Sequence, residues 1–339
     1  MSNKQKICEN NAKMEVIKNA EDIKKVIEAL GTPKISRYFY HYTSISVLFN
    51  ILENDSIWIT NTKFSNDGTE EKMLKLKNIV YYDNYMACFC DRGNQLSQWR
   101  GYCPNGGASI EFEINKPQPY SILHSDYEIS GKYELVYNTP IPVIYISEGE
   151  AEEALDVIEK VYNSDINKIG KTVPYWKNDK FEEERESRLV FSNEEGQFSE
   201  CIRFRTLSNG VKIPYMVLKT GDIGLFSRKC QDNVVDLESL EEIYKSKGRY
   251  VLIPEGSNQE QLFNETVKIV NEFNSKFNKE ESFIKVYCAG HLPIKKIMLA
   301  PTYDRERLME KVKRFCHSKY WLKNVEVTYS DIPYIPPSE

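Results

Sequence analysis

The chain has 339 residues, of which 41% are hydrophobic and 28% are charged, and this length allows a substantial core in one large domain or two smaller ones. Its 45 basic and 50 acidic side chains give a formal net charge of -5, which argues against a general nucleic-acid-binding surface but leaves a local basic groove open. No apolar run approaches the roughly 20 residues that span a bilayer, and the first residues, MSNKQKICENNAK, lack the apolar segment of a signal peptide. We therefore expect a cytoplasmic protein without a membrane-spanning segment.

The eight cysteines are scattered along the chain, as is typical of small buried side chains in a reducing compartment. The nearest approach to a metal-binding pattern is Cys88 and Cys90 with Cys103 beyond them. Because there is no C-x-x-C pair and no histidine nearby, this spacing does not predict a zinc site.

The N-terminal part of the chain predicts a polar tail and then alternating helices and strands. Residues 1–18 are expected to be disordered and residues 19–339 to form one domain. An amphipathic helix is predicted after Asn19, and acidic residues after Thr69 predict another. Between them, the sequence predicts a strand at 38–43, a helix that begins at Thr43 or Ser44, and a strand from Ile57 to Thr60.

The middle of the chain is dominated by predicted strands. Residues 85–90 are apolar on both faces, which predicts a central, covered strand, whereas residues 108–114 alternate as in a sheet with one wet face. A helical turn is predicted at 94–102. Further strands are predicted at 133–137, 143–147, 187–191, 202–206 and 214–219, with a helix over 151–162.

The last third of the chain begins with a predicted insertion or accessory segment, residues 220–282, which carries a possible strand at 250–253 and a helix at 259–277. A strand at 297–300, a helix at 304–317 and a strand at 325–329 follow, and this order predicts two parallel strands joined by a right-handed crossover. Together the elements predict an α+β fold with a mixed, mostly antiparallel central sheet and flanking helices.

His41 is the first candidate for a functional site. It follows a predicted strand and lies beside the N-terminus of the next helix, a place that favours anionic groups such as pyrophosphate. Its imidazole could donate a hydrogen bond to a ribose or phosphate oxygen. The alternative is a structural histidine whose hydrogen bonds are satisfied within the fold.

The second candidate is the segment Ser97 to Tyr102, which reads SQWRGY. Trp99 and Tyr102 could stack on a planar ring, and Arg100 could bind a phosphate or a carboxylate. The alternative is a tight turn held by two aromatic side chains and one ion pair.

The third candidate is the acidic run that precedes the apolar residues Leu189 to Phe191. If a strand begins near Glu184, then Glu184, Glu186 and Arg188 share one face, with the two carboxylates about 7 Å apart. Such a pair beside an arginine would have lowered or split pKa values and could stabilise a developing cation. The alternative is a solvated acidic face.

Several nucleotide-binding and catalytic signatures are absent from the sequence. It contains no G-x-x-x-x-G-K-[ST] loop, no G-x-G-x-x-G after a strand and no nucleophile elbow. Cys88 and Cys90 lie in a segment expected to be buried, so they are not predicted nucleophiles.

The order of the motifs resembles one known family. HYTS before a leucine-rich helix, IWITNTKFSND, YMACFC with SQWRGY, two glycines before ASIEF, ERESRLVF and VTYSDIPY are similar, in this order, to the bacterial family of domains of unknown function numbered 2971. The resemblance runs from about residue 38 to residue 335 and covers residues 220–282 poorly. That family has no settled activity, so the resemblance implies a fold and site positions rather than a reaction.

A more distant resemblance implies a mechanism. His-Tyr-Thr, a capped helix with ILE near its end and an I-W-I strand are similar to the opening of ADP-ribosyltransferase-like domains, including DNA-modifying toxins and RNA 2′-phosphotransferases. In that superfamily a histidine holds the NAD ribose, an aromatic residue stacks on nicotinamide and a glutamate supports the reacting ribose. The resemblance implies these roles for His41, for Tyr102 or Trp99, and for Glu186 with Glu184 as its partner. The implied NAD-binding residues are His41, Tyr42, Thr43, Trp99, Arg100, Tyr102 and Arg188.

Three hypotheses for function follow. The first is an ADP-ribosyltransferase-like effector of a toxin or phage-defence system, with NAD as its substrate and a protein or nucleic acid as the acceptor. The second is a non-catalytic module that binds a nucleotide or a protein partner in the same cleft. The third is a metal-dependent, nuclease-type effector in which Glu184 and Glu186 hold a metal ion.

Overall fold

The computed structural model describes residues 38–65, 83–114, 118–130, 132–147, 151–163, 165–221, 250–253, 285–288, 291–302 and 304–333. Three predicted helices, which follow Asn19, follow Thr69 and cover residues 259–277, lie outside these ranges. Residues 1–18 and most of the predicted insertion at 220–282 also lie outside them. Within the described ranges, no helix is long and apolar enough to cross a membrane.

Strands make up most of the regular structure, as predicted for the middle of the chain. The strands are β1 (Tyr38–Ser44), β2 (Ile57–Asn61), β3 (Asp83–Cys90), β4 (Gly107–Glu113), β5 (Gln118–Leu123), β6 (Tyr133–Asn138), β7 (Ile141–Pro142), β8 (Ile144–Ile146), β9 (Trp176–Asn178), β10 (Glu186–Asn193), β11 (Arg203–Thr206), β12 (Lys212–Thr220), β13 (Tyr250–Ile253), β14 (Lys285–Cys288), β15 (Ile294–Leu299) and β16 (Glu326–Tyr329). The α-helices are α2 (Ile45–Asn54), α4 (Leu96–Tyr102), α5 (Tyr127–Ser130), α6 (Ala151–Val161), α7 (Ile166–Thr172) and α11 (Arg305–Ser318). The 3-10 helices are η1 (Thr62–Phe64), η2 (Val173–Tyr175), η3 (Asp179–Glu184), η4 (Glu194–Gly196), η5 (Ser199–Cys201) and η6 (Tyr320–Leu322).

One 12-stranded sheet dominates the described part of the chain. Its order is β16-β15-β4-β1-β3-β2-β12-β5-β6, with β10 joined to β3 and β7, and β11 joined to β12. The described pairings of this sheet are antiparallel, apart from the parallel pair β15 and β16. Two short parallel sheets, β13 with β14 and β8 with β9, accompany it. The predicted α+β class with a mixed, mostly antiparallel sheet is therefore confirmed.

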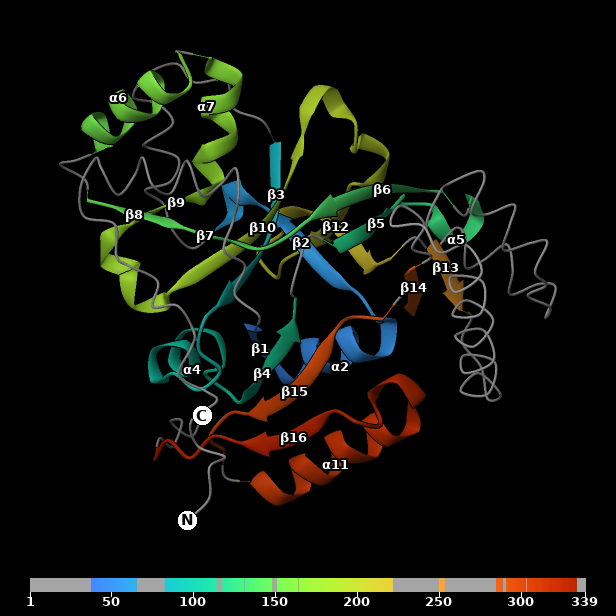
Figure 1. Ribbon diagram of the computed structural model, residues 1–339. Helices are drawn as coiled ribbons and strands as arrows, with labels where there is room; N and C mark the ends of the chain where they lie inside the picture. Colours follow the sequence, from blue (N-terminus) through green and yellow to red (C-terminus); the bar gives the residue numbers. More distant parts are fainter. Residues whose placement is uncertain are drawn as a thin grey trace, which may run out of the picture.

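The C-terminal strand, helix and strand have the predicted order and pairing. β15 and β16 are parallel, as expected for strands joined by a helical crossover. α11 packs against β16 and buries Val312 and Cys316. Figure 1 shows α11 beside these two strands at one end of the molecule, with α6 and α7 at the other.

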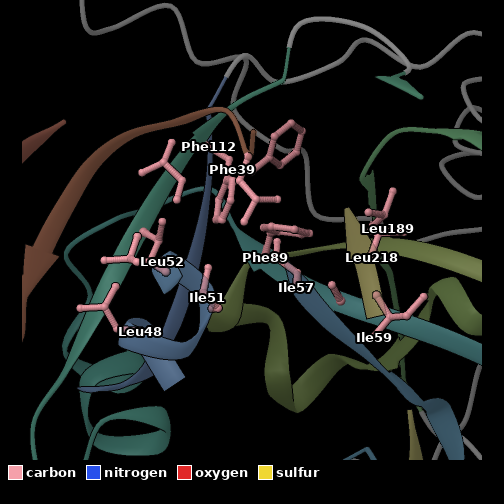
Figure 2. Close-up of a cluster of buried hydrophobic side chains, with 14 of the residues drawn as sticks. Phe39, Leu48, Ile51, Leu52, Ile57, Ile59, Phe89, Phe112, Leu189 and Leu218 are labelled. Atoms are coloured by element: carbon pink, nitrogen blue, oxygen red, sulfur yellow. The ribbon is translucent and has the colours of Figure 1, made fainter. Parts of the chain in front are cut away.

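One part of the main hydrophobic core lies between α2 and the sheet (Figure 2), and α11 covers another part with Val312 and Cys316. On α2, Leu48, Ile51 and Leu52 recur at helical spacing and are buried. On β2, Ile57 and Ile59 point into the same core, because alternate side chains of a strand face the same side of the sheet. This packing holds α2 beside the strands that flank it in sequence.

The helix α2 begins at the second of its two predicted caps. Ser44 is the N-cap, and its hydroxyl accepts a hydrogen bond from the backbone N–H of Val47. The first turn of α2 contains no acidic side chain. The positive end of the helix dipole is therefore not neutralised by the helix itself.

The strands β1 and β2 diverge along one edge of β3. β10 pairs with the whole length of β3 on its other edge. On the shared edge, β1 meets β3 at Tyr40 and Cys90, whereas β2 meets it near Thr60 and Met86. Between these points β1 pairs with β4 and β2 pairs with β12, so the middle of β3 forms the floor of an opening. We call this opening the β1–β2 wedge.

Two glycines let β4 approach β1 closely. Gly106 has a φ of 89°, a backbone conformation that is strained for a residue with a side chain. It completes the predicted turn. A Cβ atom on Gly107 would collide with the carbonyl oxygen of Thr43. Gly107 thus allows the tight contact through which β4 holds the end of β1.

Strand β5 was not predicted from the sequence, because Pro119 interrupts the pattern of a strand. The structure tolerates this proline because β12 pairs only with Tyr120 to Leu123 of β5. Pro119 lies opposite Tyr137 on the other edge, near the start of the strand. Its missing N–H therefore costs no bond to β12.

Candidate functional site

A cavity of about 460 Å³ occupies the β1–β2 wedge. Pockets for small ligands typically measure about 300–1,000 Å³, so this cavity has the size of a ligand site. β1 and the start of α2 form one wall with residues 41–44, and β2 and η1 form the other with Trp58 and Phe64 among them. Cys88 of β3 lies on the floor, and Tyr102, Lys177, Glu186 and Arg188 line the cavity as well.

His41 lines this cavity as a neutral imidazole. Its Nδ1 lies 2.9 Å from the carbonyl oxygen of Cys88, which belongs to the part of β3 that neither β1 nor β2 pairs with. A carbonyl oxygen can only accept, so Nδ1 carries the ring proton. Burial lowers the pKa of His41 below its usual value, with the Cys88 hydrogen bond opposing this in part.

The geometry changes the hydrogen-bonding role that the sequence suggested for His41. The sequence predicted that the imidazole donates to a ribose or phosphate oxygen. Because Nδ1 donates to Cys88 and the ring is neutral, Nε2 is left as an acceptor. His41 can therefore accept a hydrogen bond from a ligand hydroxyl such as that of a ribose, but it is not a donor to phosphate.

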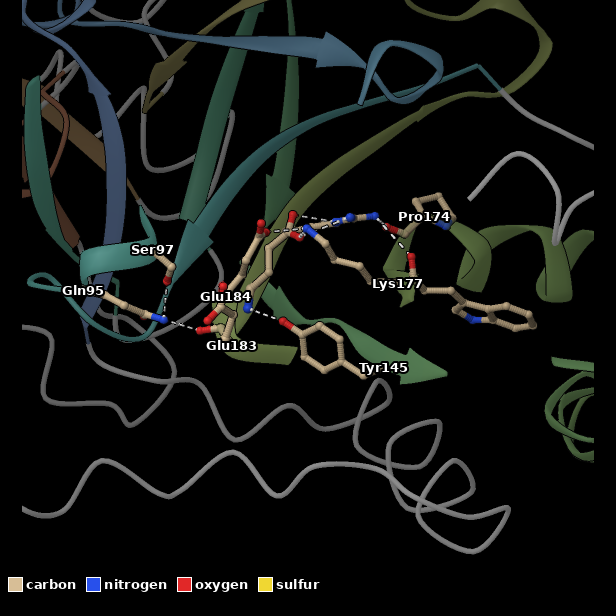
Figure 3. A network of polar contacts seen from close by, with 10 residues as sticks. Gln95, Ser97, Tyr145, Pro174, Lys177, Glu183 and Glu184 are labelled. Carbon is tan, nitrogen blue, oxygen red and sulfur yellow. Dashed lines mark hydrogen bonds and ion pairs between the residues drawn. The ribbon is translucent and has the colours of Figure 1, made fainter. Parts of the chain in front are cut away.

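Glu186 is the first residue of β10, and its carboxylate is held by two cations. Figure 3 labels Lys177, Glu184 and Tyr145 of this network. Nε of Arg188 donates to Oε1 at 2.7 Å, and Nζ of Lys177 donates to Oε2 at 2.6 Å. The backbone N–H of Glu186 donates to the hydroxyl of Tyr145 at 2.8 Å. All three charged side chains are buried, so this cluster fixes Glu186 in one orientation at the cavity.

Glu184 belongs to the same cluster, but it is held there by Lys177 and not by a shared strand face as predicted. The strand does not begin at Glu184, which is the last residue of η3, because Arg185 adopts a left-handed conformation with φ of 48°. Glu184 therefore does not share a strand face with Glu186 and Arg188. Instead, Nζ of Lys177 lies 2.6 Å from Oε2 of Glu184 and bridges the two carboxylates.

The pKa values of this cluster show which charges are present. Burial alone would raise the pKa of Glu186, but the guanidinium of Arg188 and the ammonium of Lys177 lower it to about 2. Burial likewise acts to lower the pKa of Lys177, but the carboxylates of Glu186 and Glu184 outweigh it and hold this pKa above its usual value. Glu186 is thus a carboxylate and Lys177 an ammonium at neutral pH.

Of the residues predicted in the second motif, only Tyr102 lines the cavity. Tyr102 belongs to α4, and burial, followed by the charge of Glu184, raises the pKa of its hydroxyl, which therefore stays protonated. Trp99 is fully buried, packs edge-on against Tyr42 and donates its indole N–H to Asn94 at 2.9 Å. Arg100 is exposed and does not line this cavity. Of the two aromatic side chains predicted to stack on a ring, only Tyr102 therefore faces the cavity.

Tyr42 and Thr43 also line the cavity, but the hydroxyl of Tyr42 is used in hydrogen bonds that stabilise the fold. Its hydroxyl donates to the carbonyl of Arg92 at 2.9 Å and accepts from the N–H of Gln95 at 3.0 Å. Tyr42 thereby links β1 to the loop before α4. This link places Tyr102 opposite the end of β1.

A smaller cavity of about 70 Å³ adjoins the same residues. His41, Tyr42, Cys88, Tyr102 and Glu186 line both cavities, and Glu184 faces only the smaller one of the two. Burial, with the negative charge of Glu186, raises the pKa of the Cys88 thiol well above its usual value. Cys88 therefore stays a thiol at neutral pH, although it is partly buried and lines both cavities rather than being buried as its apolar strand predicted.

Several cavity residues were not predicted from the sequence, and four of them carry a charge or a large aromatic ring. Lys177, Trp58, Phe64 and Arg205 all line the cavity. The sequence could have indicated Trp58, because side chains alternate along β2 and Trp58 therefore points away from the core that Ile57 and Ile59 enter. No such pattern indicates Lys177, because it belongs to the three-residue strand β9 inside a helical region.

The fold and the cavity define an α+β protein with a ligand-sized cleft that combines a neutral histidine, a tyrosine and a paired carboxylate. Residues 98–189 match the model of the family described as Protein of unknown function (DUF2971). The match supports, over these residues, the resemblance that the motifs indicate, and it contains Tyr102, Lys177, Glu184, Glu186 and Arg188. No curated protein and no solved structure matches the chain.

Proposed function

We propose that the cleft binds NAD as a substrate and that the protein is an ADP-ribosyltransferase-like effector. One observation carries this proposal: His41, Tyr102 and Glu186, which lie in three motifs far apart in the sequence, line one cavity. These are the residue types to which the distant resemblance assigns the ribose, the nicotinamide and the reacting centre. The proposed setting, a toxin or phage-defence system, rests on the same resemblance.

The charges of the cavity suit a dinucleotide. Three cationic side chains, Lys177, Arg188 and Arg205, and one carboxylate, that of Glu186, line it. The N-terminus of α2 adds a partial positive charge at Ser44 and Val47. A locally positive cleft in a chain with a net charge of -5 favours an anionic ligand such as a diphosphate.

The proposed reaction breaks the bond between ribose C1′ and the nicotinamide nitrogen. The bonding electron pair leaves with the nitrogen, so the pyridinium becomes neutral nicotinamide and C1′ becomes an oxocarbenium-like cation. Glu186 would stabilise that cation, Tyr102 would pack against the leaving ring, and Nε2 of His41 would accept from a ribose hydroxyl. A lone pair of the acceptor, or of water, then bonds to C1′, and the acceptor loses its proton to solvent.

The test measures the release of nicotinamide from NAD by the full chain. We expect measurable release from the native protein and a loss of about a hundredfold or more in Glu186→Gln, because an electrostatic stabiliser of the transition state is removed. Glu310→Gln is the matched control, since Glu310 is an exposed residue of α11 paired with Arg314. Its release should equal that of the native protein.

A second variant separates catalysis from folding. Tyr102→Ala removes a half-buried ring without leaving a buried charge unpaired, and we expect at least about a tenfold loss of release from a protein that still folds. No release from the native protein at millimolar NAD, or unchanged release in both variants, would contradict the proposal.

A second candidate function is a catalytically silent nucleotide-binding module. The observation in its favour is that both carboxylate oxygens of Glu186 already bind a cation, Arg188 on one side and Lys177 on the other. Such compensation weakens the attraction of Glu186 for a cationic centre. Saturable binding of NAD without release of nicotinamide would support this candidate.

The same contacts make the metal-dependent hypothesis the least favoured of the three. A divalent ion between Glu184 and Glu186 would have to displace the ammonium of Lys177, which bridges them at 2.6 Å from each carboxylate. Replacing a buried, paired lysine in this way carries a desolvation and repulsion cost.

A further inference from the structure

The cavity has a second, aromatic side that the reaction proposed above does not use. Trp58 and Phe64 line it, and these residues are 39% and 40% exposed. One face of the Trp58 indole covers the ring of Tyr215, with ring centroids 4.5 Å apart and planes 28° apart. The remaining surface of the indole borders the cavity.

The strand register places Trp58 on the same face of the sheet as the charged cluster. Thr60 of β2 pairs with Met86 of β3, and Arg188 of β10 pairs with Cys88 of β3. Since alternate residues of a strand share a face, Trp58 faces the side that carries Cys88, Arg188 and Glu186. His41 belongs to the β1 wall and Trp58 to the β2 wall, so a ligand in the wedge lies between them.

Stacking on Tyr215 makes Trp58 a pre-oriented platform. Its backing ring limits the rotation of the indole, so little side-chain entropy is left to lose when a ligand binds. A large aromatic side chain left this exposed in a cleft is a common feature of sites that bind planar rings, and stacking on a nucleobase suits such a surface.

A cation lies in the same lining. Arg205 of β11 is exposed, and its guanidinium forms no ion pair or hydrogen bond with the other residues that the structure describes. A guanidinium in this state is available for a phosphate, which it can bind through two parallel N–H groups.

We propose that Trp58 is the platform on which the adenine ring of the dinucleotide stacks, with Arg205 binding its diphosphate. This inference deepens the proposed function, on which it rests for the identity of the ligand. The nicotinamide ribose takes the polar end of the cavity at His41, Tyr102 and Glu186, so the second ring of the dinucleotide takes the aromatic wall. The ligand class that follows is an adenine nucleotide with a diphosphate.

The experiment uses the full chain and ADP-ribose, which contains the adenine and the diphosphate but no nicotinamide. Of the four tryptophans, Trp99 and Trp176 are fully buried, whereas Trp58 is exposed in the cavity. We expect ADP-ribose to quench tryptophan fluorescence in the native protein. The quenching should disappear in Trp58→Phe, in which calorimetry still detects binding within about threefold of the native affinity.

Affinity provides the second readout. We expect Trp58→Ala to weaken ADP-ribose binding at least about tenfold, because a stacking surface is lost, and to leave the binding of ribose 5-phosphate unchanged. Arg205→Gln should weaken both ligands. Phe204→Ala is the matched control, since Phe204 is an exposed aromatic residue of β11 that does not line this cavity.

The results separate this inference from the proposed reaction. If ADP-ribose quenches Trp58 but NAD releases no nicotinamide, the platform stands and the catalytic proposal fails. If NAD is cleaved with the same KM by the native protein and Trp58→Ala, the catalytic proposal stands and the platform is overturned. Native affinity of Trp58→Ala for ADP-ribose, or no binding of ADP-ribose at all, also overturns it.

Discussion

At the scale of single residues, the site depends on how Glu186 is kept charged inside the protein. An unpaired buried carboxylate would be protonated or would destabilise the fold. Arg188 prevents this because its guanidinium donates to both oxygens of Glu186, at 2.7 and 3.2 Å, and also to the carbonyl of Pro174 at 2.7 Å. Arg188 therefore acts as a positioning residue that ties Glu186 to the segment before β9.

Removing Arg188 should destabilise the protein in a pH-dependent way. We expect Arg188→Met to lower the free energy of unfolding at pH 7 by about 3–5 kcal/mol, because it leaves Glu186 buried with only Lys177 as a partner. The pKa of Glu186 is about 2 in the folded protein, below its ordinary value of 4.5, so its stabilising contribution is complete above pH 4.5 and is lost as the pH falls towards 2. The difference between the two proteins should narrow over that range.

Urea unfolding at a series of pH values checks this prediction. Arg314→Met is the control, since the Arg314 side chain is 77% exposed and forms only a surface pair with Glu310. We expect this control to change stability by about 0.5 kcal/mol or less. A difference between Arg188→Met and the native protein that stays constant from pH 7 to pH 2.5 would show that Glu186 is not the titrating partner.

At the scale of elements, the cleft exists because β1 pairs with β4 along its whole length but meets β3 only at Tyr40 and Cys90. The contact of Gly107 with the backbone of Thr43 lies at the centre of this arrangement. A side chain at position 107 would push against the end of β1, where His41, Thr43 and the cap of α2 are located. Gly106 and Gly107 therefore determine the position of the β1 wall of the cleft as well as the turn before β4.

Two glycine substitutions should have opposite effects on stability. We expect Gly107→Ala to cost about 1–3 kcal/mol or more, because its Cβ meets backbone that cannot rotate away. Gly101→Ala, in the helix α4, should stabilise the protein by about 0.5–1 kcal/mol, since nothing lies within 4 Å of its Cβ position. Thermal unfolding compares the two; equal destabilisation by both would contradict the described packing at Gly107.

The sequence predicted most elements with a strong periodic pattern. The helix α2, the strands β2, β3, β4 and β10, and the C-terminal unit β15-α11-β16 follow from alternation, helical spacing and caps. The weakly patterned elements β5 and β9 were missed, because a proline or a length of three residues hides their period. The strand predicted at 187–191 is observed as β10, but the start near Glu184 on which the shared face of Glu184 and Glu186 depended is not, because nothing local indicates the left-handed Arg185.

At the scale of the whole molecule, the cleft is a product of sheet topology. The strands β1 and β2 share one edge of β3 and leave the middle of that edge unpaired. Residues from β1, β2, β3, α4, β9 and β10 meet at this place. Motif order could predict that His41, Tyr102 and Glu186 belong to one site. It could not predict the lysine that bridges the two glutamates or the aromatic wall, because both depend on tertiary pairing between distant segments.

The most direct test of this account is a crystal structure of the protein with an NAD analogue whose nicotinamide–ribose bond resists cleavage. We expect density in the β1–β2 wedge, with the nicotinamide ring against Tyr102, a ribose hydroxyl within about 3.2 Å of Nε2 of His41 and the adenine ring on Trp58. Density for the analogue at another place on the protein, or an empty wedge at a saturating concentration, would contradict it.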